Sequence, residues 1–357
     1  MPRKSSPSNK QPASKAEAAI ASARDGGLRY VSDEEPGLRR HETRKGFRYV
    51  DAAGRPVKDE AILRRVRALA IPPAYCDVWI CPRANGHLQA TGRDARGRKQ
   101  YRYHARWAEV RDQQKFSRIE AFGAALPRLR RRLRTDLKRS GFPREKVAAI
   151  LVGVMADTLV RIGNKTYERG NKSYGLTTLR NRHVSFLRGG RARLKFVGKS
   201  GVEQEVVLDD KRLSKLLRHC QQLPGQHLFQ YRDEDGDVQP VDSGLVNDYL
   251  REAMGSEFTA KDFRTWGGTL AATHLLADMP WDEGGASQRA MASMRKSVEV
   301  EVARLLGNTP AVCRKSYIDP RVYKAWEQGW LARASVNVRG PRQWEQLALR
   351  LLRRKRT

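Results

Sequence analysis

Five polar side chains in this 357-residue chain are of the types that can act together on a phosphodiester. Attack on a phosphodiester without a metal ion needs a nucleophile, cationic donors for the charge that grows on the non-bridging oxygens, and an acid for the leaving alkoxide. The candidates are Tyr317, Arg161, Arg264, Lys199 and Asn308. Each has an ordinary structural explanation when taken alone, so the elements that carry them decide between chemistry and packing.

The tyrosine and the asparagine lie in residues 307–320. Gly307 suits the end of one helix, and Thr309 is a good N-cap for a short new helix that begins at Pro310. The i, i+3 spacing puts Tyr317 on the same face of this helix as the arginine three residues before it. Taken alone, the stretch is more typical of an ordinary helix with a half-buried tyrosine.

The three remaining candidates fall at the ends of predicted elements. Residues 146–162 show the apolar pattern of a central helix, with Arg161 in its last turn, where a cation either complements the helix dipole or enters a cleft. A predicted hairpin over residues 193–208 places Lys199 at its tip. Arg264 falls in the first turns of a helix that begins after a threonine cap.

Composition favours a polyanionic partner. The 70 Lys and Arg against 39 Asp and Glu leave a formal charge of +31, and the excess runs through folded-looking segments as well as the tails. Nucleic acid is therefore the expected partner. A soluble, cytoplasmic protein is expected, because no apolar run approaches the length of a membrane-spanning helix and the N-terminus lacks the hydrophobic core of a signal peptide. Four cysteines without C-x-x-C spacing favour reduced thiols and no metal site.

The pattern of apolar residues predicts an α+β fold in three segments. A flexible basic tail over residues 1–26 has too few large apolar side chains to offset the entropy of ordering. A small antiparallel sheet domain follows over residues 27–106, and a larger, mainly helical domain with a three-stranded antiparallel sheet covers residues 107–357, ending in a basic extension. The expected strands are residues 28–31, 47–50, 77–81, 87–91, 98–103, 183–187, 193–197 and 202–208, and a helix is expected at residues 59–69.

One strand of the small sheet combines cations with aromatic rings. Between Gly92 and His104, the basic residues interleave with tyrosines, and alternate residues of a strand face the same way. Such a face can hold phosphates with its cations and place aromatic side chains in a groove, or it can be a solvated, charged hairpin. The residues expected to face DNA are Arg93, Arg98, Lys99, Tyr101 and Tyr103.

Taken together, these segments resemble the type IB DNA topoisomerases of the poxvirus and bacterial subclass. The resemblance covers roughly residues 28–335, with the motifs in the expected order, which makes it far more specific than any single motif. Besides the strand described above, the matching segments are Arg161-Ile-Gly-Asn-Lys-Thr-Tyr167, Gly175-Leu-Thr-Thr-Leu-Arg-Asn-Arg-His183, Lys195-Phe-Val-Gly-Lys199, Lys261-Asp-Phe-Arg264-Thr-Trp-Gly, and Gly307-Asn-Thr-Pro through Lys315-Ser-Tyr317.

The resemblance implies a mechanism and a partner. Tyr317 would attack a DNA phosphodiester to form a 3′-phosphotyrosine, Arg161 and Arg264 would bind the phosphate oxygens, and Lys199 would protonate the leaving 5′ oxygen. The strand would then rotate and rejoin without ATP or any cofactor. The implied partner is supercoiled duplex DNA in the bacterial nucleoid, held by a monomer that closes around it as a clamp. Further DNA contacts are expected from Tyr167, Arg180, Lys261 and Arg314.

Two points stay open in this reading. Where many relatives have histidine, this chain has Asn308, whose amide can donate to a phosphate oxygen but cannot become cationic or transfer a proton. The tyrosine phenol is protonated at neutral pH, and no general base is evident. Either the cations Arg161, Arg264 and Arg314 favour the phenolate, or water accepts the proton.

Two other classes of protein share part of this pattern. Tyrosine recombinases use the same chemistry, but they usually carry histidine three residues before the second arginine, where this chain has Lys261, and their N-terminal part is helical. An architectural DNA-binding protein would explain the charge but not the five candidate residues.

Overall fold

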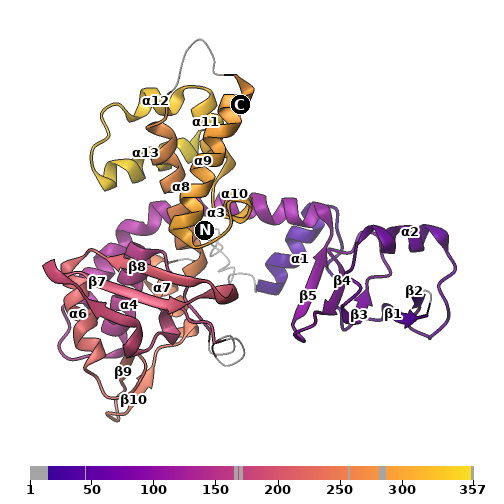
Figure 1. The fold of residues 1–357 in the computed structure, drawn as a ribbon, viewed down its shortest axis with the longest axis horizontal. Coiled ribbons are helices and arrows are strands. Elements are labelled where there is room, and N and C mark those ends of the chain that lie inside the picture. The colour runs from indigo at the N-terminus through magenta and orange to yellow at the C-terminus, as the bar shows by residue number, and fades with distance from the viewer. Residues whose placement is uncertain are drawn as a thin grey trace, which may run out of the picture. The chain divides into compact units, whose positions relative to one another are not determined.

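The computed structural model describes residues 15–44, 46–164, 168, 172–255, 258–280 and 287–354. The chain divides into two compact units, residues 1–115 and 116–357, and Figure 1 shows the helices and strands of each. The division falls inside one long helix, α3 (Ala105–Asp136), some ten residues beyond the expected boundary after residue 106.

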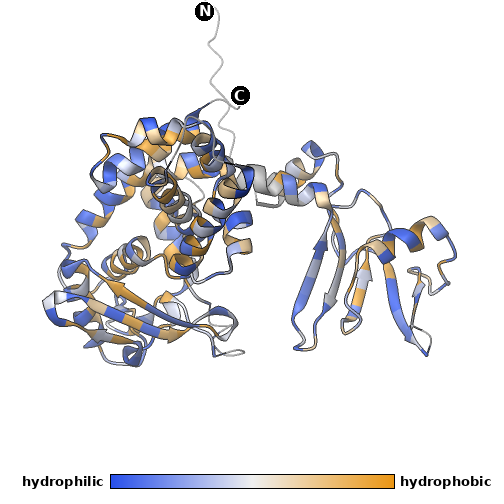
Figure 2. Cartoon of the chain, turned by 45° about the horizontal axis from the view of Figure 1, so that its top comes forward, coloured by the Kyte–Doolittle hydropathy of each residue, from blue (hydrophilic) through white to orange (hydrophobic). Residues whose placement is uncertain are grey.

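The first unit is built on a five-stranded antiparallel sheet with the strand order β2-β1-β3-β4-β5. One side packs around Leu38, Val66, Val78 and Ile80, all buried. Figure 2 shows mostly hydrophilic residues on the edge strand β5. The elements are α1 (Lys15–Asp25), β1 (Leu38–Thr43), β2 (Gly46–Val50), α2 (Glu60–Ala68), β3 (Cys76–Ile80), β4 (Leu88–Arg93) and β5 (Lys99–Tyr103).

Two predictions for the first unit were wrong. Part of the expected flexible tail is helix α1, which is anchored because Ala23 packs with Leu28 and Trp107; residues 1–14 lie outside the described residues. The first expected strand, residues 28–31, forms only an isolated bridge, while β1 takes the place beside β3. Strand β1 could not be predicted from the pattern of apolar residues, because Leu38 is its only buried residue.

The second unit combines a bundle of helices with a three-stranded antiparallel sheet, β6-β7-β8, whose expected turns are confirmed. Its elements are α4 (Arg144–Thr158), β6 (Val184–Phe186), β7 (Ala192–Val197), β8 (Glu203–Leu208), α6 (Lys211–Gln221), β9 (Gln230–Arg232), β10 (Val238–Pro240), α7 (Ser243–Met254), α8 (Ala260–Ala277), α9 (Gln288–Leu306), α10 (Pro310–Ser316), α11 (Pro320–Glu327), α12 (Trp330–Ser335) and α13 (Pro341–Arg353), with short 3₁₀ turns that include η1 (Leu176–Thr178) and η4 (Lys199–Gly201).

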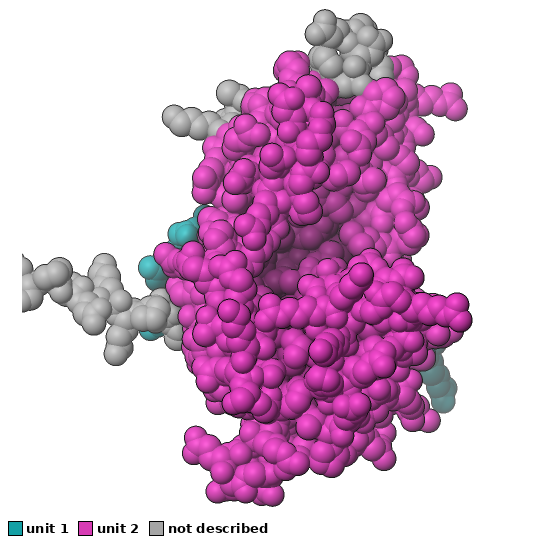
Figure 3. All heavy atoms as spheres, turned by 90° about the vertical axis from the view of Figure 1, so that its left-hand side faces the viewer, with its two compact units in different colours: residues 1–115 teal, residues 116–357 magenta. Residues whose placement is uncertain are grey.

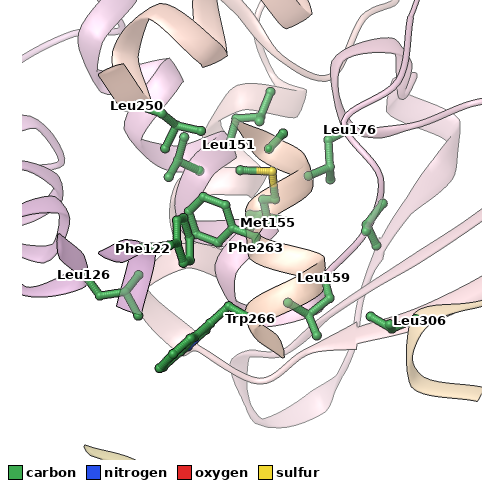
Figure 4. Close-up of a cluster of buried hydrophobic side chains, with 14 of the residues drawn as sticks. Phe122, Leu126, Leu151, Met155, Leu159, Leu176, Leu250, Phe263, Trp266 and Leu306 are labelled. Carbon is green, nitrogen blue, oxygen red and sulfur yellow. The ribbon is translucent and has the colours of Figure 1, made fainter. Parts of the chain in front are cut away.

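The core of this unit surrounds α4, whose residues from Val147 to Met155 are all buried. Phe122 meets the ring of Phe263 edge to face at 4.9 Å. Figure 4 shows Leu159 and Leu306 in the same cluster, near Trp266. Because these two leucines end α4 and α9, the core fixes both chain segments that leave those helices. The predicted α+β fold, with a small antiparallel sheet in the first unit and a three-stranded antiparallel sheet in the second, is confirmed; the second unit also contains a two-stranded sheet, β9-β10.

Candidate active site

The sequence predicts Arg161 in the last turn of a helix, but in the structure Arg161 lies just beyond the end of α4. The helix ends at Thr158 because Leu159 adopts a left-handed φ of 55°. Its side chain fits there only because Gly267 has no Cβ, which would lie 2.7 Å from Leu159 Cδ2. The carbonyl of Arg161 accepts a hydrogen bond from Leu176 N at 2.9 Å. The backbone of Arg161 is therefore held by η1, and the helix-dipole explanation does not apply.

The guanidinium of Arg161 holds the turn that follows α9. Its Nη2 donates to the carbonyl of Gly307 at 3.0 Å and to Oδ1 of Asn308. Gly307 has the predicted left-handed φ, 56°. The other end of the asparagine amide, Nδ2, is buried and has no hydrogen-bond partner among the described residues. Asn308 is thus oriented by Arg161, and its weak interaction with the Cys313 thiol, which acts against the rise in the thiol pKa that burial causes, leaves Nδ2 for an incoming acceptor.

Arg264 is a buried cation that joins three parts of the site. Its Nη1 donates to Leu159 O at 2.5 Å and its Nη2 to Leu306 O at 2.6 Å. Its guanidinium carbon lies 5.2 Å from the ring centroid of Tyr317. Burial lowers the pKa of Arg264, while the charge of and hydrogen bond to Tyr317 act in the opposite direction. An arginine stays protonated under such shifts, so the tyrosine has a permanent cation beside it.

Tyr317 follows the last residue of α10, where local capping and α8 fix its backbone. Thr309 caps α10 as predicted by accepting from Val312 N at 3.4 Å. The Tyr317 N–H donates to Cys313 O at 2.9 Å, and Tyr317 O accepts from Thr269 Oγ1 at 3.2 Å. The half-buried ring is therefore attached to a rigid backbone.

The close approach of α8 to Tyr317 predicts a strong effect of one methyl group. A Cβ on Gly268 would lie 2.7 Å from Tyr317 O, so Gly268→Ala must push the tyrosine segment away. A misplacement of about 1 Å costs roughly 100-fold in rate. We therefore expect the variant to form the covalent adduct between Tyr317 and DNA, which the family resemblance implies, about 10- to 100-fold more slowly.

The matched control for this substitution is Gly340→Ala, since a Cβ at Gly340 meets nothing within 4 Å. Single-turnover formation of the adduct, measured for both variants, checks the prediction. Equal rates in both variants would show that the contact with α8 does not position Tyr317.

Lys199 lies at the tip of the β7–β8 hairpin, as predicted, where Ser200 takes a left-handed φ of 65°. It lines one pocket together with Arg161 and Arg264. Figure 3 shows that one face of the second unit is hollowed between its helical bundle and the half that contains the sheet. Among the five candidates, Arg161 is in direct contact with Asn308 and Arg264 with Tyr317, and Lys199 shares the pocket of the two arginines.

The residues expected to face DNA from the first unit are exposed on the β4–β5 hairpin, with Arg93 at the end of β4, Arg98 in the turn and the other three on β5. The rings of Tyr101 and Tyr103 stack with centroids 6.0 Å apart, and both are exposed. The three cations around them have carboxylate partners: Arg93 with Asp77, Arg98 with Asp94, and Lys99 with Asp33. Exposed ion pairs of this kind are weak, so phosphate groups can compete for these cations.

The remaining expected DNA contacts are not part of the same cluster. Arg180 donates to Glu168 at 3.1 Å, Lys261 is exposed on the first turn of α8, and Arg314 is exposed, 3.9 Å from Glu299. Tyr167 lies outside the described residues.

Sequence reasoning missed two side chains in the pocket, Tyr174 and Gln204. Gln204 alternates with exposed neighbours on β8, and no motif distinguishes it. The Gly267-Gly268 pair of α8 packs closely against the Leu159 side chain and the backbone of Tyr317. In the described part of the chain, no three His, Cys, Asp or Glu residues gather as metal ligands would, and no helix is long and apolar enough to cross a membrane.

The fold and the geometry together define a class of protein. The phenol of Tyr317 lies beside the buried guanidinium of Arg264. The guanidinium of Arg161 holds the turn that carries the Asn308 amide. Such a set of groups is chemically suited to attack on a phosphodiester. The surrounding chain is strongly basic. The fold and the site therefore point to the class of enzymes that act on a nucleic acid backbone.

Comparison with known proteins identifies the family. Residues 104–328 match the catalytic core of eukaryotic DNA topoisomerase I, and residues 46–94 match the N-terminal domain of bacterial DNA topoisomerase IB. DNA topoisomerase 1B of Acanthamoeba polyphaga mimivirus is 33% identical over 260 residues, which cover 72% of this chain and 77% of that protein. DNA topoisomerase I of Monkeypox virus is 23% identical over 276 residues, covering 74% and 82%.

The chain therefore belongs to the type IB DNA topoisomerase family. Membership makes it an isomerase whose substrate is DNA, and the match of its N-terminal domain is to the bacterial form. The expected resemblance is confirmed over most of the chain.

Proposed function

We propose that this enzyme relaxes supercoiled duplex DNA by cutting one strand through a 3′-phosphotyrosine at Tyr317, allowing rotation, and rejoining the strand. The observation that carries the proposal is the contact of Tyr317 with Arg264, whose guanidinium also holds the ends of α4 and α9. We further propose that the enzyme acts as a monomer in the bacterial nucleoid, with both units contacting DNA.

Cleavage proceeds by in-line displacement at phosphorus. The Tyr317 oxygen forms a bond to phosphorus while the bond from phosphorus to the 5′ oxygen breaks, and Lys199 gives its proton to that oxygen. Arg161, Arg264 and the free Nδ2 of Asn308 donate to the non-bridging oxygens as their charge grows. The phosphotyrosine conserves the energy of the broken diester, so attack by the 5′ hydroxyl reverses the step without ATP or any other cofactor.

Arg264 is the group that we assign to activation of the phenol. A fixed cation beside the ring stabilises the negative charge that develops on the attacking oxygen in the transition state, and water can accept the proton. Arg314, in contrast, is directed toward Glu299. The carboxylate nearest in sequence, Asp319, is fully buried and accepts from Arg321 at 2.7 and 3.0 Å, so it is not available as a base.

The test is plasmid relaxation by the whole chain in EDTA, without ATP, followed by denaturation to trap the adduct. We expect relaxed topoisomers and a covalent complex that carries the DNA 3′ phosphate and leaves a free 5′ hydroxyl. Relaxation that needs ATP, or an adduct at the 5′ phosphate, would overturn the proposal. Recombination between paired sites would identify a recombinase, and binding without relaxation would identify an architectural protein.

Asn308 predicts a flat pH profile near neutrality. Asn308→His introduces an imidazole, whose unperturbed pKa is about 6.5, whereas the asparagine carries no titrating group. The imidazolium adds a positive charge beside the phosphate, so the ratio of variant to parent cleavage rates should rise by about threefold or more as the pH falls from about 8 to about 5.5. Profiles of the same shape for the two proteins would contradict the assignment of Asn308 as a neutral donor.

A further inference from the structure

The side chain of Gln204 lies across the backbone of two separate segments of the site. It projects from β8, where Gln204 pairs with Phe196 of β7. A Cβ on Gly198 would lie 2.8 Å from Gln204 Cγ, and a Cβ on Gly307 would lie 2.8 Å from Gln204 Nε2 and still nearer to Oε1. Both positions have room for this side chain only because they are glycines.

Each of these glycines precedes a proposed functional residue. Gly198 begins the hairpin turn, with its N–H bonded to Val202 O at 2.8 Å, and leads directly into Lys199. Gly307 leads into Asn308, and its carbonyl accepts from Arg161. Gln204 thus touches the backbone that carries the proposed acid and the backbone that carries the phosphate donors, and it lines the pocket shared by Lys199 and Arg161.

The amide of Gln204 is not needed to hold its own strand. Its Nε2 makes a long hydrogen bond of 3.3 Å to the carbonyl of the preceding residue, Glu203. The register of β7 with β8 is set by six consecutive residue pairs from Ala192↔Leu208 to Val197↔Glu203. A hairpin tip that extends beyond such a ladder can still tilt, and Gln204 is the side chain that rests between the tip and Gly307.

We propose that Gln204 is a positioning residue that fixes the Lys199 hairpin against the Gly307–Asn308 turn, so that the lysine ammonium reaches the leaving 5′ oxygen. This inference rests on the proposed function, because it presumes that Lys199 is the acid. In the step concerned, the electron pair of the breaking phosphorus–oxygen bond moves to the 5′ oxygen, which takes a proton from Nζ. An alkoxide needs that proton, whereas a thiolate, derived from a far stronger acid, leaves without it.

The test compares two DNA duplexes that differ at one atom, with oxygen or sulfur as the 5′ bridging atom at a cleavage site mapped from the covalent adduct. Cleavage by the full chain is measured in single turnover. We expect Gln204→Ala to cleave the oxygen substrate about 10- to 100-fold more slowly than the parent. With the bridging sulfur, its rate should return to within about threefold of the parent.

The matched control is Glu205→Ala, the next residue of β8, which is exposed and is directed to the opposite face. It should match the parent on both substrates. If Gln204→Ala fails to fold by its thermal transition, Gln204→Asn, shorter by one methylene group, replaces it, with a smaller loss and the same recovery. A loss of equal size on both substrates, or no loss, would overturn the inference.

Lys199→Ala separates failure of this inference from failure of the proposed function. If Lys199 is the acid, Lys199→Ala should lose about 100- to 10,000-fold on the oxygen substrate and recover with sulfur. Recovery of Lys199→Ala without recovery of Gln204→Ala would overturn only the role of Gln204. Absence of recovery in Lys199→Ala would overturn the acid role of Lys199, and with it the proposal for Gln204.

Discussion

Tyr317→Phe should form no covalent DNA adduct, and its plasmid relaxation should fall by about 10⁴-fold or more. Removing the nucleophile from an enzyme that works through a covalent intermediate lowers its rate by a factor of this size, because no other group forms the intermediate. The phenyl ring keeps the contact with the Arg264 guanidinium and the backbone bonds of Tyr317 to Cys313 and Thr269, so the fold should be preserved. Denaturing electrophoresis with labelled DNA measures the adduct.

The control for Tyr317→Phe is Tyr323→Phe. Tyr323 is a tyrosine of the neighbouring α11, and its hydroxyl donates to the buried carboxylate of Glu299 at 3.4 Å. The Tyr323→Phe variant should form the DNA adduct at a rate within about threefold of the parent, while its free energy of unfolding falls because this hydrogen bond is lost. An adduct still formed by Tyr317→Phe, or one lost only in Tyr323→Phe, would remove Tyr317 as the nucleophile. Affinity for DNA in both variants should match the parent, since binding depends mainly on cations.

Local signals in the sequence predicted the surroundings of Tyr317 well. A left-handed glycine, a threonine cap and a proline at the first helical position act within a few residues, and all three are present at Gly307, Thr309 and Pro310. The hairpin tip at Lys199 follows from equally local turn chemistry. These features could be predicted because their causes lie next to them in the chain.

Features that depend on tertiary contacts were not predictable in the same way. The turn that releases Arg161 from α4 needs Leu159 to pack against Gly267, far along the sequence. The bond between Arg161 and Asn308 joins residues 147 positions apart, and only the family resemblance brought them together in advance. Strand β1 is polar and lacks the apolar alternation that would predict a strand. Its place in the sheet is fixed by its hydrogen bonds to β2 and β3, which the local sequence does not reveal.

Arg264 is the candidate whose loss should affect both stability and chemistry. Its side chain is 4% exposed, and its two terminal nitrogens each hold a buried carbonyl, at Leu159 and Leu306. A lysine keeps the charge but cannot bridge both carbonyls, because it lacks the planar fork. We expect Arg264→Lys to lower the free energy of unfolding by about 2 to 4 kcal/mol, the cost of leaving buried polar groups unpaired. Chemical denaturation measures this change.

The effect of Arg264→Lys on cleavage should exceed its effect on stability. The Nε of Arg264 is buried without a hydrogen-bond partner in the described part of the structure, so a phosphate oxygen can accept from it when DNA is bound. Loss of that donor, together with the guanidinium plane that fixes the charge beside Tyr317, should slow adduct formation by about 10³-fold or more, even where the variant is fully folded and keeps a positive charge. Arg304→Lys, an exposed α9 residue paired with Glu301, should leave the rate unchanged. Equal rates for the two variants would show that Arg264 only supports the fold; a large loss in folded Arg264→Lys requires a phosphate contact that lysine cannot reproduce.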